Sequence, residues 1–138
     1  MEKSKFQFSN PTLRRLEFDV HTGFINHGKL NMEIGVAVNI RRDKNDDETP
    51  GNTADVLVTL SVGSKENLTP FYIEAEEGAH FKWEEDAFNE EQIEMLLNQN
   101  AVALLLSYLR PIVANLTAAS PYPVYNLPYI NLTQADNS

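Results

Sequence analysis

The residues best suited to chemistry in this sequence do not fall into a catalytic or metal-binding pattern. His21, His27 and His80 lack the spacing of metal ligands, although His21 and His27 flank a predicted turn at Gly23. The acidic run 43–48 lacks the spaced ligands and closing glutamate of a calcium-binding loop. Cysteine is absent, which excludes disulfides and thiolate chemistry, and no phosphate-binding loop or nucleophile elbow occurs. We therefore expect no catalytic residue, no metal site and no cofactor, and a protein that is not an enzyme.

Length and composition predict one ordinary globular domain. The chain has 138 residues, of which 42% are hydrophobic and 22% are charged. We expect this domain to span residues 1–138, with flexible ends at 1–11 and 134–138. No run of eighteen apolar residues occurs, and residues 1–8 lack a secretory signal, so we expect a cytoplasmic protein without membrane insertion.

The net charge of −9 limits the class of partner. A nucleic-acid binder needs a basic surface, so we expect no nucleic-acid partner. The charge favours a partner that carries a basic patch, although acidic surfaces are also common on proteins without such a partner.

The first part of the chain has the pattern of an antiparallel sheet. Four stretches alternate apolar and polar residues, as half-buried strands do: 16–20, 30–40, 55–64 and 70–83. The charged stretch 42–53 is predicted to be a mobile connection, and Gly78 to mark a bulge or bend. The short links between the strands favour an antiparallel meander.

After residue 88 the pattern changes to that of helices. Asn89 and Gln92 form a capping-box pattern at the start of a short helix, and 98–100 is predicted to interrupt it. A longer helix follows over 101–118, and Pro111 is expected to kink or split it. Strands followed by helices predict an α+β domain.

The longer helix is apolar on most of its circumference. Six of its residues mark the core and oligomer positions that we expect: Leu104, Leu105, Tyr108, Leu109, Ile112 and Val113. Such a helix must be buried on more than one side, and one small sheet covers only one. We therefore expect a second subunit on the other side, in a dimer or a tetramer.

A segment rich in proline and tyrosine follows the helix. Residues 121–132 contain three prolines, three tyrosines and several aliphatic residues. Proline fixes φ and removes a hydrogen-bond donor, so this segment is neither helix nor central strand. We expect it to form an extended C-terminal strap over an apolar surface.

These residues resemble the SecB family of bacterial export chaperones. SecB has Tyr-Ala-Arg where this chain has Tyr108-Leu109-Arg110, and Phe-Pro where it has Tyr122-Pro123. An Asn-Leu run ending in Asn-Phe matches 126–132, and the end of a SecB strand matches 73–81. The resemblance is to a shorter SecB-like protein of the kind found in Gram-positive bacteria. It implies a four-stranded antiparallel sheet, the long helix and a tetramer of paired dimers.

The resemblance also implies a binding role. SecB proteins hold unfolded or nascent polypeptides, so we expect a chaperone active in protein transport or folding. In SecB a second helix follows the strap and helps to form the client grooves. This sequence ends at Ser138, so we expect client contacts to be made differently.

Two surfaces are candidate binding sites. The first is an acidic sheet face of five residues: Glu17, Asp19, Tyr72, Glu74 and Glu76. In SecB the corresponding face contacts the ATPase SecA, which implies a SecA-like or other basic partner; the alternative is a solvated face. The second is an aromatic group that either lines a peptide groove or pins the strap to the protein: Phe81, Trp83, Tyr122, Tyr125 and Tyr129. The alternative to a chaperone is an adaptor of the same fold that docks one folded basic partner through the acidic face.

Overall fold

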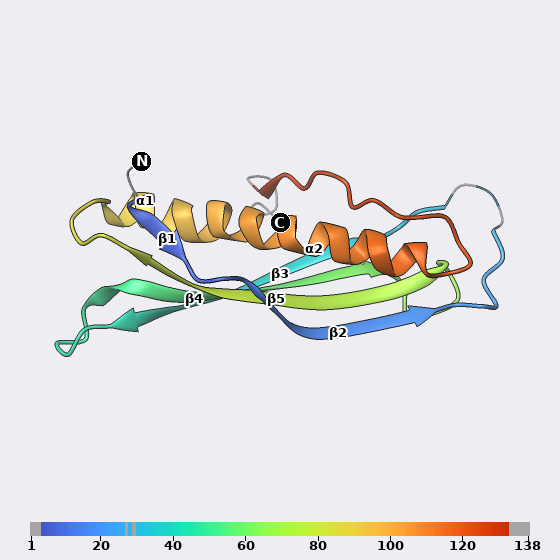
Figure 1. The fold of residues 1–138 in the computed structure, drawn as a ribbon, viewed down its shortest axis with the longest axis horizontal. Coiled ribbons are helices and arrows are strands. Elements are labelled where there is room, and N and C mark those ends of the chain that lie inside the picture. Colours follow the sequence, from blue (N-terminus) through green and yellow to red (C-terminus); the bar gives the residue numbers. More distant parts are fainter. Residues whose placement is uncertain (1–3, 27, 29, 133–138) are drawn as a thin grey trace.

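The protein is a single antiparallel sheet with one helical run across one of its faces. The computed structural model describes residues 4–26, 28 and 30–132. The helical run lies along the length of the sheet, and the chain after it turns back over the helix on the side away from the sheet (Figure 1). The expected flexible stretch 134–138 and residues 1–3 lie outside the described residues.

The sheet has five strands, so the expectation of four was wrong. Their bounds are β1 Phe6–Phe8, β2 Thr12–Val20, β3 Ile34–Lys44, β4 Pro50–Gly63 and β5 Phe71–Trp83. The order is β1-β5-β4-β3, and β2 also pairs with β5. The extra strand is β1, which lies within the stretch expected as a flexible end and pairs with the last residues of β5. Pro11 has no N–H to donate to a ladder, which accounts for the break between β1 and β2.

The two faces of the sheet differ sharply in burial. The inner face, which carries the helix, includes Val56, Val58, Leu60 and Val62 of β4, each at most 1% exposed. Ile73 on β5, paired with Val62, is also fully buried. The residues between them point to the outer face, which is open and polar. The alternation that predicts β4 is therefore confirmed.

The stretch 42–53 is a hairpin rather than a mobile connection. Residues 42–44 end β3 and residues 50–53 begin β4. The turn closes with hydrogen bonds from Asn45 N to Thr49 O, 2.9 Å, and from Glu48 N to Asn45 O, 2.9 Å. The Asp47 carboxylate accepts from both the backbone N–H and the hydroxyl of Thr49, which lowers the pKa of Asp47. A charged sequence can thus form an ordered turn when its side chains bond to its own backbone.

The predicted bulge exists, but on the neighbouring strand. The pairing of β4 with β5 is regular through Gly78, whereas the pairing of β2 with β5 shifts between Leu13 and Arg15. Arg14 is thus the extra residue, and Gly78 lies opposite Thr12 beside it. A Cβ on Gly78 would lie 3.4 Å from Cζ of Arg14, so the absent side chain leaves room for the arginine.

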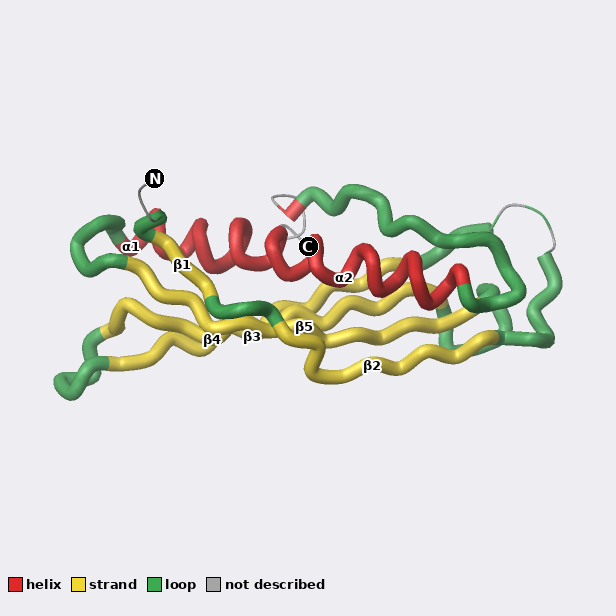
Figure 2. The backbone as a smooth tube through the Cα atoms, viewed as in Figure 1, coloured by secondary structure: helices red, strands yellow, loops and turns green. Residues whose placement is uncertain are grey.

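The helical run is continuous from residue 90 to 118. It consists of α1 Glu90–Met95, the π-helical turn η1 Leu96–Asn100 and α2 Ala101–Ala118 (Figure 2). Asn89 and Gln92 form the predicted capping box. The predicted interruption at 98–100 is instead a π turn, in which Ala101 N donates to Leu96 O. The run is long and apolar enough to pass a length-and-composition test for a membrane span, a test that core helices also pass.

The π turn keeps the helix in phase with the sheet. An α-helix turns by about 100° per residue, so a stripe that repeats every four residues drifts by about 40° per turn. The buried stripe repeats in this way through Ile93, Leu97, Ala101, Leu105 and Leu109. A turn that takes up an extra residue offsets that drift and brings α1 and α2 onto the same sheet.

Pro111 does not split α2. The helix runs through it, and Pro111 lies on an exposed side. Of the six predicted core and oligomer positions, Leu105, Leu109 and Val113 are fully buried against the sheet. Leu104 and Ile112 are half-buried, and Tyr108 is 42% exposed. These three form an open flank of α2.

Candidate functional site

A groove lies between α2 and the end of the chain. It has a volume of about 670 Å³. Its walls come from the η1–α2 region and from the returning segment: Gln99, Asn100, Ala103, Leu106, Arg110, Tyr129, Ile130, Asn131 and Leu132. We call it the α2 groove. Apolar walls with a few amide and guanidinium groups suit an extended polypeptide, whose backbone needs hydrogen bonds and whose side chains need apolar contacts.

The returning segment is held to α2 by polar contacts from its backbone. Arg110 donates from Nη1 to Leu127 O, 2.6 Å, and from Nη2 to Pro128 O, 3.1 Å. The buried Thr117 hydroxyl accepts from Tyr125 N at 2.9 Å. These bonds satisfy backbone groups in a stretch without regular secondary structure, so the outer wall of the groove has a defined position.

The aromatic group predicted from the sequence divides between two ends of the molecule. Phe81 and Trp83 are buried on the inner face, and the ring of Phe6 stacks on both. Tyr122 donates to His21 O at 2.6 Å, and Tyr125 packs edge-on against Phe71. Burial raises the pKa of Tyr125. Tyr129 is 86% exposed and lines the α2 groove.

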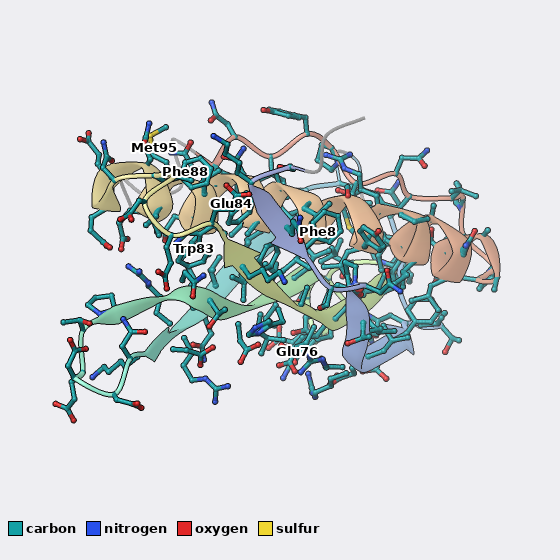
Figure 3. The ribbon with its side chains drawn as sticks, turned by 60° about the vertical axis from the view of Figure 1, so that its left-hand side comes forward. Phe8, Glu76, Trp83, Glu84, Phe88 and Met95 are labelled. Carbon is teal, nitrogen blue, oxygen red and sulfur yellow. The ribbon has the colours of Figure 1, made fainter. Side chains whose placement is uncertain are left out.

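A second, smaller hollow lies at the other end of the π turn. It has a volume of about 320 Å³ and is lined by Phe88, Gln92, Met95, Leu96 and Asn100. Figure 3 shows Phe88 and Met95 on the helix side, at the α1 end of the molecule. Asn100 lines both this hollow and the α2 groove. Sequence reasoning did not identify this hollow, and the available signal was the polar run 98–100 within an apolar helix.

The predicted acidic residues share the outer face of the sheet. Glu17 pairs with Glu74, and Asp19 pairs with Tyr72, across β2 and β5. Glu76 lies one outward position further along β5, and Figure 3 shows it on the side of the sheet opposite the helix. The structure thus brings the five predicted residues together on one face of the sheet, where Tyr72 is only 6% exposed.

An arginine that sequence reasoning missed lies within this acidic face. Arg15 forms ion pairs with Glu74 and, at 3.3 Å, with Glu17. The Arg15 hydrogen bond, helped by that of Tyr72, lowers the pKa of Glu74, while burial raises the pKa of Tyr72. Arg15 has the same strand parity as Glu17 and Asp19, and this parity was the available signal.

One carboxylate, that of Glu77, lies on the apolar inner face of the sheet. Glu77 pairs with Val58 and Leu13 on the inner face, and its side chain is 3% exposed. Its Oε1 atom has no hydrogen-bond partner within the described part of the chain. Burial raises the pKa of Glu77, although the Arg14 charge acts in the other direction.

His21 and His80 have separate partners. His21 Nδ1 lies 2.9 Å from Thr69 O, and His80 Nδ1 lies 2.9 Å from Asp55 Oδ1 on the outer face. His27 lies outside the described residues. Among the residues that the structure describes, no three His, Asp or Glu side chains form a group that holds a metal ion.

The sheet, the single long helix and the groove beside it define the class as an α+β protein of SecB-like fold. A model of the SecB family, described as preprotein translocase subunit SecB, matches residues 8–135. This chain belongs to the SecB family.

Individual proteins are similar to this chain in fold or in sequence. The SecB-like chaperone Rv1957 of Mycobacterium tuberculosis, solved with a ChAD peptide from the HigA1 antitoxin, superposes with a TM-score of 0.68. It is 17% identical, over 92% of this chain and 88% of its own. A protein of unknown function from Streptococcus agalactiae has a TM-score of 0.52 at 14% identity, over 90% and 97% of the two chains. By sequence, the uncharacterized protein MJ0357 of Methanocaldococcus jannaschii is 25% identical over 94% of this chain and 81% of its own.

Proposed function

We propose that this protein is a non-enzymatic chaperone of the cytoplasm that holds unfolded, nascent or export-bound polypeptides. The observation that carries the proposal is the α2 groove, about 670 Å³ between α2 and the returning segment. The segment acts as the strap that forms the outer wall, and Tyr129 supplies an exposed apolar ring. The family and the peptide-bound neighbour in Mycobacterium tuberculosis support a role in binding polypeptides.

The aromatic group has two roles in this proposal. Phe81, Trp83, Tyr122 and Tyr125 hold the sheet, β1 and the strap together through the contacts described above. Tyr129 contacts the client. The division follows exposure, because a ring that is buried in the free protein has no area left to offer a client.

The test is suppression of aggregation of a chemically unfolded client, followed by light scattering. We expect the wild type to suppress aggregation at stoichiometric amounts. Ala103→Arg places a long charged side chain in the groove from an exposed helix position and should remove most of the effect. Ala37→Arg, at an exposed position on β3, is the matched control and should act as wild type. Equal activity of both variants would contradict the groove assignment.

Self-association is part of the proposal. Leu104, Tyr108 and Ile112 repeat every fourth residue along the open flank of α2 and are incompletely covered in the single chain. A second subunit, in a dimer or tetramer, buries this flank. Sedimentation should show an oligomer at micromolar concentration, and Tyr108→Arg should shift it to smaller species. A wild-type monomer at that concentration would contradict this part of the proposal.

An adaptor is the alternative function, and the outer face favours it. Glu17, Asp19, Tyr72, Glu74 and Glu76 form one surface for a basic partner such as a SecA-like ATPase. Reversing the charge at Glu17, Asp19 and Glu74 should then remove one captured partner and leave the fold intact. The control reverses three exposed glutamates elsewhere, Glu33, Glu66 and Glu85. An unchanged partner profile would remove this alternative.

A further inference from the structure

The outer face of the sheet is not uniformly acidic. Beyond Gly78, towards the end of β5, its charge changes sign in two neighbouring hollows. The first has a volume of about 270 Å³ and includes Arg14 and Arg41 in its lining. The second has a volume of about 390 Å³ and includes Lys5 and Lys82. Four cations of a chain with net charge −9 therefore gather on one half of one face.

Three of these four cations are available to a ligand. Arg41 is paired with Asp55 at 2.5 Å, and Asp55 also accepts from His80. The His80 hydrogen bond, with help from Arg41, lowers the pKa of Asp55. This carboxylate therefore stays ionised and bound to both partners. Within the described part of the chain, Lys5, Arg14 and Lys82 form no ion pair within 4.0 Å. Glu84 lines the second hollow without pairing to Lys82 or Lys5.

Arg14 owes its position to the bulge and to a glycine. As the extra residue of β2, it projects over the outer side of Gly78, where a Cβ would lie 3.4 Å from its Cζ and Nη2 atoms. Its Nε donates to Thr12 Oγ1 at 2.8 Å, which leaves the two Nη groups directed at the hollow. A guanidinium held in this way presents a two-pronged donor, which matches a carboxylate.

The spacing of the hollows fits an extended chain. Arg14 lies over Gly78 of β5. Gly78 and Lys82 are four residues apart on this strand, which is about 13 Å at about 3.3 Å per residue. Side chains four residues apart in an extended polypeptide span the same distance. The spacing along β5 thus matches that of two carboxylates four residues apart on one extended segment.

The opposite half of the face decides between polymer classes. Glu76 is the outward-facing residue of β5 next to Gly78 on the acidic side. Glu74, Glu17 and Asp19 lie further along the face in the same direction. A nucleic acid needs a continuous basic surface, because every phosphate is charged, and would meet these carboxylates within one or two nucleotides. A polypeptide can be acidic over a short stretch and neutral or basic after it.

We propose that Lys5, Arg14 and Lys82 form a docking strip for a short acidic segment of a partner polypeptide, in extended conformation, with two carboxylates four residues apart. This strip is separate from the α2 groove, which lies on the other side of the sheet. The strip gives the protein a second means of selecting a partner. It selects by charge, whereas the α2 groove selects by apolar contacts.

The test uses a labelled peptide of three Glu-Ser-Thr-Ser repeats and the same peptide with glutamine for each glutamate. Fluorescence anisotropy should show binding of the glutamate peptide that weakens as salt is added, and at least tenfold weaker binding of the glutamine peptide. Arg14→Ser with Lys82→Ser should weaken the glutamate peptide at least tenfold. Lys5→Ser with Lys82→Ser is a second pair, which shares Lys82 but keeps Arg14, and the same loss is expected.

The matched control is Lys44→Ser with Lys65→Ser, because neither lysine lines a hollow of the strip. This control should bind within twofold of wild type. No measurable binding of the glutamate peptide, or an equal loss in the control, would overturn the proposal. A twelve-nucleotide thymidine strand that binds as tightly and is lost in the same variants would overturn the assignment to a polypeptide. Suppression of aggregation through the α2 groove should persist in the strip variants, which separates this result from the proposed function.

Discussion

The inner and outer faces of the sheet are built from alternate residues of the same strands, and they differ in the polarity and burial of those residues. On the inner face the alternating residues are apolar and almost fully buried, with Glu77 as the exception. On the outer face they are charged in both senses, with carboxylates in excess at one half and cations in excess at the other. Because inner residues lose their contact with water and outer ones keep it, the inner face determines stability and the outer face is free to vary for binding.

The largest effect that tests this contrast is loss of an inner side chain. Leu60→Ala leaves a cavity at a fully buried position and should lower the free energy of unfolding by about 2–5 kcal/mol. Thr59→Ala, one residue earlier on the outer face, should change it by no more than about 0.5 kcal/mol. Urea denaturation followed by circular dichroism measures both. Similar losses for the two variants would remove the contrast between the faces.

A smaller effect concerns the strap. Thr117→Val keeps the shape of a fully buried side chain but removes the acceptor of Tyr125 N–H. An unsatisfied buried donor costs about 1–3 kcal/mol, so we expect that loss of stability and faster amide exchange at Tyr125. Thr117→Ser keeps the hydroxyl and should retain slow exchange. If valine leaves the exchange unchanged, this bond does not hold the strap.

Glu77 gives the inner face a pH dependence. Its raised pKa means that the folded state holds this proton more tightly than the unfolded state, so its ionisation weakens the fold as pH rises above the unfolded value. Glu77→Gln should therefore increase the free energy of unfolding at pH 7, by on the order of 1 kcal/mol. The gain should disappear in acid, where wild-type Glu77 is protonated in both states. A loss of stability at pH 7 would show that the carboxylate has a partner in solution.

The smallest effect on stability is expected at Gly78, and it separates stability from binding. A Cβ there would meet Leu57 Cδ1 at 3.2 Å and Arg14 Cζ at 3.4 Å, both ends of movable side chains. Gly78→Ala should change the free energy of unfolding by less than about 1 kcal/mol, but its methyl group would touch the Arg14 guanidinium and narrow the positions that the guanidinium can take. The acidic peptide should then bind several-fold more weakly. Full retention of peptide binding would show that Arg14 does not act from this position.

Much of the fold follows from alternation and capping. The period-two pattern of β4 and the capping box at Asn89 are local signals, and the structure confirms both. The strand β1 was missed because its three residues are stable only through pairing with β5, a partner about 75 residues away. The π turn was missed because its benefit, keeping Ile93 and Leu109 on one sheet, exists only in the packed state.

The candidate sites show the same division. Strand parity was enough to place Glu17, Glu74 and Glu76 on one face. The burial of Glu77 was not predicted, because a carboxylate on the inner face has no counterpart in the polar pattern of the strand. The α2 groove depends on where the segment after residue 120 returns. The hydrogen bonds of Arg110 that determine this path join residues that are 17 and 18 positions apart in the sequence.

The most direct test of the account is the location of a bound client. A photo-crosslinking amino acid at Ala103 in the α2 groove and one at Ala37 on the outer face would be compared with the same unfolded client. Both positions are exposed alanines, so the two probes have similar access to solvent. We expect strong crosslinking to the client from Ala103 and little from Ala37. Equal crosslinking from both positions, or a stronger signal from Ala37, would contradict the groove as the client-binding site.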